Sequence, residues 1–210
     1  ACGPAHRPLH VGQRLLESHS FVSQAQPTLL EETRSAFAGT WRLIVGRRDA
    51  PGYFFTDTRG LTSSFIALLV SVVVTFLISA LVAPGGTEVS TFAALVQNAL
   101  LYAGIMSASW VVLRLTGLTD RFTAFVTVEN WVNAIVSIAL AFVALVTVSA
   151  ELILLLAVVI GFLARINNAR LVVGMTAGQI VMPIVVQTIG MLIALLAVGL
   201  IYGPMPTPEI

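Results

Sequence analysis

The sequence has few of the residues from which catalytic and metal sites are usually built. It contains one cysteine, Cys2, which excludes an internal disulfide, a cysteine-rich zinc site and a CxxC redox pair. Its three histidines all precede residue 20, so no histidine pair can ligate haem further along the chain. Gly-x-x-x-x-Gly-Lys, Gly-x-Ser-x-Gly and His-Glu-x-x-His motifs are absent. The sequence therefore predicts no enzyme, no metal site and no protein-bound cofactor, although a bound lipid is compatible with it.

Charge is also scarce. Charged residues make up 10% of the chain and hydrophobic residues 57%, with a mean hydropathy of +0.94. A soluble domain is nearer a quarter charged, so this chain has too little polar surface to be covered by water and is predicted to lie in a membrane. Lysine is absent, and the net charge of +1 predicts no nucleic-acid partner.

Five apolar stretches are candidates to cross a bilayer, which takes about 20 residues. They cover residues 62–83, 91–113, 122–146, 150–164 and 175–202. One helix over 122–164 would be about twice the membrane thickness, so we expect a break where polarity returns at Thr147, Ser149 and Glu151. The predicted fold class is therefore all-α: a polytopic membrane protein with five transmembrane helices over 61–203 and a short outer tail over 204–210.

The arginines fall on one side of this five-span arrangement. Seven of the eleven precede residue 60, and the other four lie in the second and fourth loops, at Arg114, Arg121, Arg165 and Arg170. The first loop, the third loop and the C-terminal tail have none. The positive-inside rule then predicts a cytoplasmic N-terminus and a C-terminus on the outer side.

An amphipathic cytoplasmic helix is predicted before the first span, within a segment covering 28–60. Thr28 and Glu31 have the spacing of a capping box, and Gly46 is a helix stop. Apolar residues recur on one face, which predicts either a helix lying flat on the membrane or one packed on the bundle, and the two can coexist. The predicted interfacial anchor consists of Phe37, Trp41, Arg42, Arg47 and Arg48.

Residues 1–27 are weakly patterned. His6, His10 and His19 lie there, but no carboxylate or cysteine completes a metal site. We therefore expect a flexible N-terminal tail.

Polar side chains lie inside the predicted spans. Glu129 is the most costly of these, because an intramembrane carboxyl is expensive and marks a functional-site hypothesis by default. It is either a protonatable group in a polar pocket, or a link to a neighbouring helix through Arg114 or Arg170; we favour the link. Pro183 is expected to kink the fifth helix. The full intramembrane polar cluster is Glu129, Asn130, Asn133, Asn98, Gln97, Gln179 and Gln187.

Three short segments carry a family resemblance: TRSAFAGTWRLIVGRRDAPGYFFTDTRG, GLTDRFTAFVTVENW and FLARINNARLVVGMTAGQ. With the pattern of residues 33–202, they resemble the small Yip1-like integral membrane proteins of alphaproteobacteria. The resemblance implies a five-helix bundle in the bacterial cytoplasmic (inner) membrane, with a cytoplasmic N-terminus and a periplasmic C-terminus. Eukaryotic relatives are linked to vesicle trafficking, and no catalytic residues come with the family.

Two functions are compatible with these features. The first is a non-enzymatic accessory or scaffold subunit that binds membrane lipids and other integral membrane proteins. The alternative is a small transporter or channel in which Glu129 is the protonation or ligand site.

Overall fold

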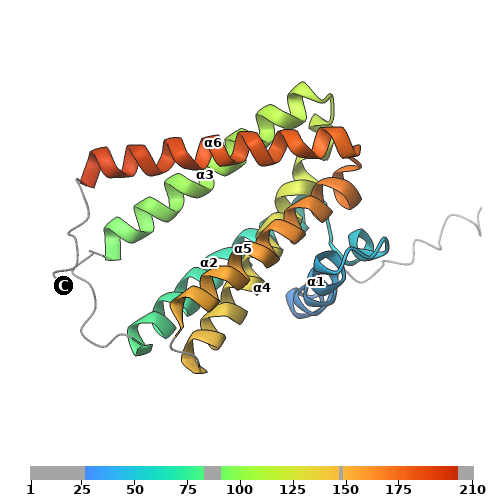
Figure 1. Ribbon diagram of the computed structural model, residues 1–210. Helices are drawn as coiled ribbons and strands as arrows, with labels where there is room; N and C mark the ends of the chain where they lie inside the picture. Colours follow the sequence, from blue (N-terminus) through green and yellow to red (C-terminus); the bar gives the residue numbers. More distant parts are fainter. Residues whose placement is uncertain (1–26, 83–90, 147–148, 203–210) are drawn as a thin grey trace, which may run out of the picture.

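The computed structural model describes residues 27–82, 91–146 and 149–202, and these residues form helices and turns without a strand (Figure 1). The predicted tails, 1–27 and 204–210, lie outside the described residues apart from Pro27. The predicted all-α class is confirmed for the described part of the chain.

The described residues form six α-helices. Four apolar segments are long enough to cross a membrane: Thr58–Leu81, Leu95–Leu115, Thr119–Val146 and Glu151–Val173. The last helix contains a shorter apolar segment, Ala177–Gly190. The helices are α1 (Leu29–Ile44), α2 (Thr58–Val82), α3 (Thr91–Leu115), α4 (Phe122–Val146), α5 (Ala150–Asn167) and α6 (Ala177–Tyr202), with short helical turns η3 (Ala50–Tyr53), η4 (Thr119–Arg121) and η5 (Asn168–Val173).

The apolar run 122–164 is divided into two helices, as its length and its polar interruption predict. α4 ends at Val146, and Ser149 caps the start of α5. The Ser149 hydroxyl accepts from the Leu152 N–H at 3.2 Å and donates to the Glu151 carboxylate at 3.0 Å. These bonds satisfy groups that a new helix start would otherwise leave unpaired.

α5 continues beyond the expected end at residue 164. It runs to Asn167 and passes into a π-helical turn, η5, whose residues Asn168, Ala169 and Val173 are buried. Gly174 then ends the helix with a positive φ of 83°, a conformation that suits glycine. The polar residues expected to form a loop are therefore helical; Asn167 and Asn168 are buried, whereas Arg170 is exposed.

The helices form two groups that diverge (Figure 1). α2, α4 and α5 run side by side, while α3 and α6 pair with each other. Ser64, Ser71 and Ile78 of α2 are buried and are spaced seven residues apart, so they lie on one face of the helix. The two serines are small, which allows α2 to pack closely on α4. The ends that carry arginine, namely the starts of α2 and α4 and the ends of α3 and α5, lie at the same end of the molecule.

α1 packs on α4 and α5 through a face of small residues. The buried residues of α1 include Ala36, Gly39, Thr40 and Leu43. Ala36 and Leu43 share a core with Trp131 of α4, whereas Gly39 lies against Tyr53 and Phe54.

The opposite face of α1 stays exposed. Leu30, Phe37 and Trp41 have 78%, 64% and 66% of their surface accessible. The helix thus packs on protein with one face and leaves an apolar face open, so the two arrangements expected from the sequence are compatible.

We expect Gly60→Ala to destabilise the bundle. A Cβ at Gly60 would lie 1.8 Å from the Phe55 carbonyl oxygen, so the start of α2 must shift. Overpacking of this kind costs about 1–3 kcal/mol of unfolding free energy. The measurement is thermal unfolding in detergent, followed by circular dichroism.

Gly161→Ala is the matched control. An added Cβ there meets nothing within 4 Å, so the helix propensity of alanine should stabilise α5 by about 1 kcal/mol. Equal melting temperatures for the two variants would contradict the packing of α2 described above.

Candidate functional site

Glu129 lies in the second turn of α4 and is 2% exposed. Its Oε1 accepts from Arg165 Nε at 3.0 Å, and its Oε2 accepts from Asn168 Nδ2 at 3.4 Å. Asn168 also donates to the Phe125 carbonyl at 3.3 Å. A buried carboxylate is tolerated when it is paired and hydrogen-bonded, and here both oxygens are bonded by the α5–η5 segment.

The partner of Glu129 differs from the two predicted. Arg114 lies over the Trp110 ring, 5.1 Å from its centroid, and Arg170 donates to the Gly46 carbonyl at 3.4 Å. The expected pairing with either residue is therefore wrong. The sequence contains the missed signal, because Glu129 lies 17 residues before Val146, the end of α4, and Arg165 lies 15 residues after Ala150, the start of α5, so the two fall at similar heights of the helix pair.

Asn130 joins three helices. It is fully buried, donates to the Ser64 hydroxyl of α2 at 3.1 Å, and accepts from the Tyr102 hydroxyl of α3 at 2.6 Å. Its carboxamide is therefore a structural connector. Sequence reasoning missed Ser64 and Tyr102, since a serine or tyrosine in an apolar helix carries no marker of its partner.

The other predicted polar residues separate into two sets. Gln187 of α6 donates to the Ser109 hydroxyl of α3 at 2.8 Å and lines the cavity beside Glu129. Gln179 instead accepts from the Thr176 N–H at 2.9 Å, which caps the start of α6. Gln97 and Asn98 do not line this cavity, and Pro183 lies inside α6 as expected.

A cavity of about 400 Å³ lies next to the ion pair. Its walls come from α3, α4, α5 and α6, between the two diverging helix groups. Most of the lining is apolar. The polar lining residues are Glu129, Asn133, Ser137, Arg165, Gln187 and Thr188. The structure therefore places an amphipathic space beside a buried ion pair.

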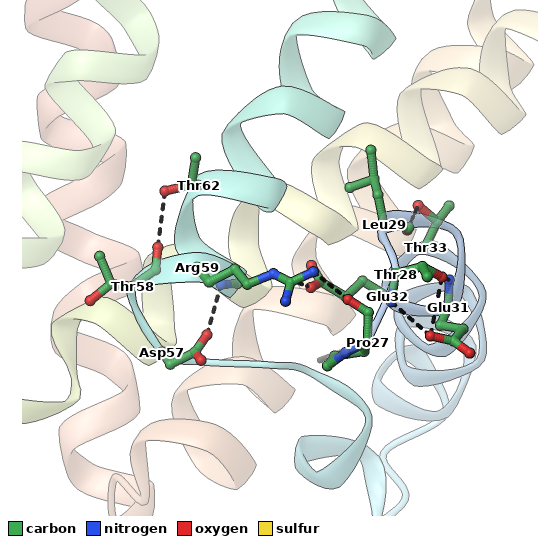
Figure 2. A network of polar contacts seen from close by, with 11 residues as sticks. Pro27, Thr28, Leu29, Glu31, Glu32, Thr33, Asp57, Thr58, Arg59 and Thr62 are labelled. Carbon is green, nitrogen blue, oxygen red and sulfur yellow. Dashed lines mark hydrogen bonds and ion pairs between the residues drawn. The ribbon is translucent and has the colours of Figure 1, made fainter. Parts of the chain in front are cut away.

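A second buried carboxylate fixes α1 (Figure 2). Glu32 is 2% exposed and pairs with Arg59 Nε of α2 at 3.3 Å. Arg59 also donates to the Pro27 carbonyl, and Asp57 accepts from the Gly60 N–H at 2.7 Å. Glu32 was not singled out from the sequence alone, so this contact was missed.

The predicted interfacial arginines take part in local pairs. Arg42 and Arg47 contact Asp49 at 2.5 and 3.1 Å, and Arg42 lies over the Tyr53 ring, while Arg48 is exposed. Desolvation raises the pKa of Asp49, but a backbone hydrogen bond and then Arg47 and Arg42 outweigh it, so the pKa lies below its usual value. This cluster therefore stays ionised at neutral pH and orders the turn after α1.

The described residues contain no group of three or more His, Cys, Asp or Glu side chains arranged to hold a metal.

We expect Arg165→Leu to destabilise the protein by about 2–4 kcal/mol, because it leaves the Glu129 charge buried without its cation. Replacing both residues, Glu129→Leu with Arg165→Leu, removes that charge and should recover most of the loss. Chemical or thermal unfolding in detergent measures both values.

The control is Arg121→Leu, which breaks an exposed pair with Asp120 and should change stability by less than about 1 kcal/mol. A double variant as unstable as Arg165→Leu alone would contradict a paired, buried carboxylate.

Comparison with known proteins gives no match: no family model, curated protein or solved structure is similar to this chain.

Proposed function

We propose that this protein is a non-enzymatic helix bundle of a bacterial inner membrane, which acts as an accessory or scaffold subunit of a larger membrane protein complex. The observation that carries the proposal is the use of polar groups as connectors between helices. Glu129 is bonded by Arg165 and Asn168 from the next helix, and Asn130 is bonded by two further helices.

These bonds suit a structural role. Lipid gives helices no hydrophobic reason to associate, so close packing and interhelical hydrogen bonds hold membrane bundles together. Both oxygens of Glu129 already accept a hydrogen bond and the residue is 2% exposed, which favours a fixed contact between helices over a site that exchanges protons or solutes.

The proposed orientation has the arginine-bearing end in the cytoplasm and the C-terminus in the periplasm. It is supported by the gathering of the arginine-bearing helix ends at one end of the molecule, together with the positive-inside rule. α1 then lies at the inner interface, with Phe37 and Trp41 toward lipid, since aromatic side chains favour that depth.

The resemblance to Yip1-like proteins is part of this proposal. It is supported by the helical architecture and by the blocks quoted above, which fall on α1, on the start of α4 and on η5. Such a protein would act by holding partners in the membrane.

We expect a tagged copy at native expression, purified in mild detergent, to retain stoichiometric integral membrane partners identified by mass spectrometry. The apolar face of α1 is proposed to lie on lipid, so Phe37→Gln with Trp41→Gln should leave that set of partners unchanged.

Loss of partners in this variant would indicate that partners bind the exposed face of α1. A protein that remains alone after crosslinking in native membranes would contradict the scaffold role.

A second candidate function is transport of a small solute or proton. The observation in its favour is the cavity that brings Glu129, Asn133, Ser137 and Gln187 together between diverging helices. In that case the Glu129–Arg165 pair would open during transport and expose the carboxylate.

For that alternative, we expect Glu129→Gln to abolish flux across proteoliposomes, read as proton movement with an internal pH dye. Glu151→Gln removes an exposed carboxyl at the start of α5 and is the control. Wild-type flux in Glu129→Gln, or no flux above empty vesicles in the unaltered protein, would exclude Glu129 as a transport site.

A further inference from the structure

The polar end of the cavity lies near the level of lipid headgroups. About 20 residues cross the hydrocarbon core, so counting back from Val146 at the far end of α4 places the near boundary at about residue 127. Glu129 is two residues inside that boundary, about 3 Å along the helix. α1, an amphipathic helix, packs at the same level, against Val128 and Trp131. The Glu129–Arg165 pair therefore sits just below the headgroup region.

Arg165 has donors left over at this depth. Its Nε is bonded to Glu129, while its two terminal nitrogens have no partner among the residues that the structure describes. The side chain is 35% exposed and forms part of the cavity wall. Planar guanidinium groups bind phosphate through such paired nitrogens.

Polarity falls steadily along the α4 wall of the cavity. Glu129, Asn133, Ser137 and Leu140 share one face of the helix and all line the cavity. Charge, amide, hydroxyl and alkyl groups thus follow one another away from the headgroup boundary. The Asn133 amide has no hydrogen-bond partner in the described part of the chain.

Beyond Arg165, the α5 wall of the cavity is apolar. α5 contributes Ala157, Val158, Gly161 and Phe162, and an added Cβ at Gly161 meets nothing within 4 Å. Alkyl chains fit against such a surface. An amphipathic ligand with a charged head and an apolar tail matches both walls.

We propose that this cavity binds one glycerophospholipid from the adjacent leaflet. Its phosphate binds the terminal nitrogens of Arg165, an ester carbonyl accepts from the Asn133 amide, and an acyl chain lies between Leu140 and Phe162. Glu129 and Arg165 are together neutral, so a zwitterionic headgroup such as phosphatidylethanolamine leaves the site without net charge. The inference goes beyond the scaffold role and depends only on membrane insertion. A resident lipid would also occupy the space that a transported solute needs.

The test uses the full-length protein in detergent, titrated with phosphatidylethanolamine or diacylglycerol, with bound lipid counted by native mass spectrometry. We expect one phosphatidylethanolamine per protein, and diacylglycerol, which lacks the phosphate, to bind at least about tenfold more weakly. Gly161→Leu places a side chain in the cavity and should reduce phospholipid binding about tenfold. Gly178→Leu fills open space outside the cavity and should bind as the unaltered protein does.

A second variant tests the phosphate contact while keeping the ion pair with Glu129. Arg165→Lys keeps a cation beside Glu129 but offers one nitrogen, so the preference for phosphatidylethanolamine over diacylglycerol should fall to about threefold. Arg170→Lys, at an exposed position on η5, should retain the full preference.

Three results would overturn the proposal. One is equal binding of the two lipids by the unaltered protein. Another is undiminished phospholipid binding by Gly161→Leu. The third is capture of a polypeptide, in place of lipid, by a photoreactive residue at Phe162.

Discussion

The Glu129–Arg165 ion pair is the constraint on which much of the structure depends. A lone carboxylate at this depth would be expensive, and pairing it with the following helix fixes how α4 and α5 lie against each other. The pair also holds Arg165 in the cavity wall, because its Nε is bonded to Glu129. One interaction thus sets both a helix register and the polar end of a cavity.

The segment that follows Arg165, from Asn167 to Arg170, also positions α1. Asn167 donates to the Leu43 and Ile44 carbonyls at 2.8 and 3.3 Å, which satisfies the C-terminus of α1, and Asn168 faces α4. Adjacent side chains of a helix point in different directions, so neighbouring asparagines can serve two neighbouring helices. The π-helical turn continues this arrangement to Arg170, which reaches Gly46. This segment therefore holds the C-terminal end of α1, while the Glu32–Arg59 pair holds its N-terminal end.

Local signals in the sequence predicted local structure well. Thr28 and Glu31 form the expected capping box, Gly46 follows the end of α1 with a positive φ, and the break between α4 and α5 lies at Ser149. The docking face of α1 was not predictable in this way, because Ala36, Gly39 and Thr40 carry little hydrophobic signal and are buried for their small size. The partner of Glu129 was also missed, since four arginines lie near the same predicted membrane boundary and only the hairpin geometry selects Arg165.

A scaffold and a lipid site are physically related here. Interhelical hydrogen bonds, such as that between Tyr102 and Asn130, help to hold the helices together. Many large apolar side chains therefore remain on the outer surface of the bundle, where lipids or partner helices can contact them. The divergence of α3 and α6 from the other helices exposes Asn133 and Arg165 to a space that hydrocarbon alone fills poorly, because their donors would remain unpaired. A phospholipid supplies acceptors at the polar end and alkyl chains at the other. The ligand would then act as a further packing element between the two helix groups, and the affinity of the site would affect how far they separate.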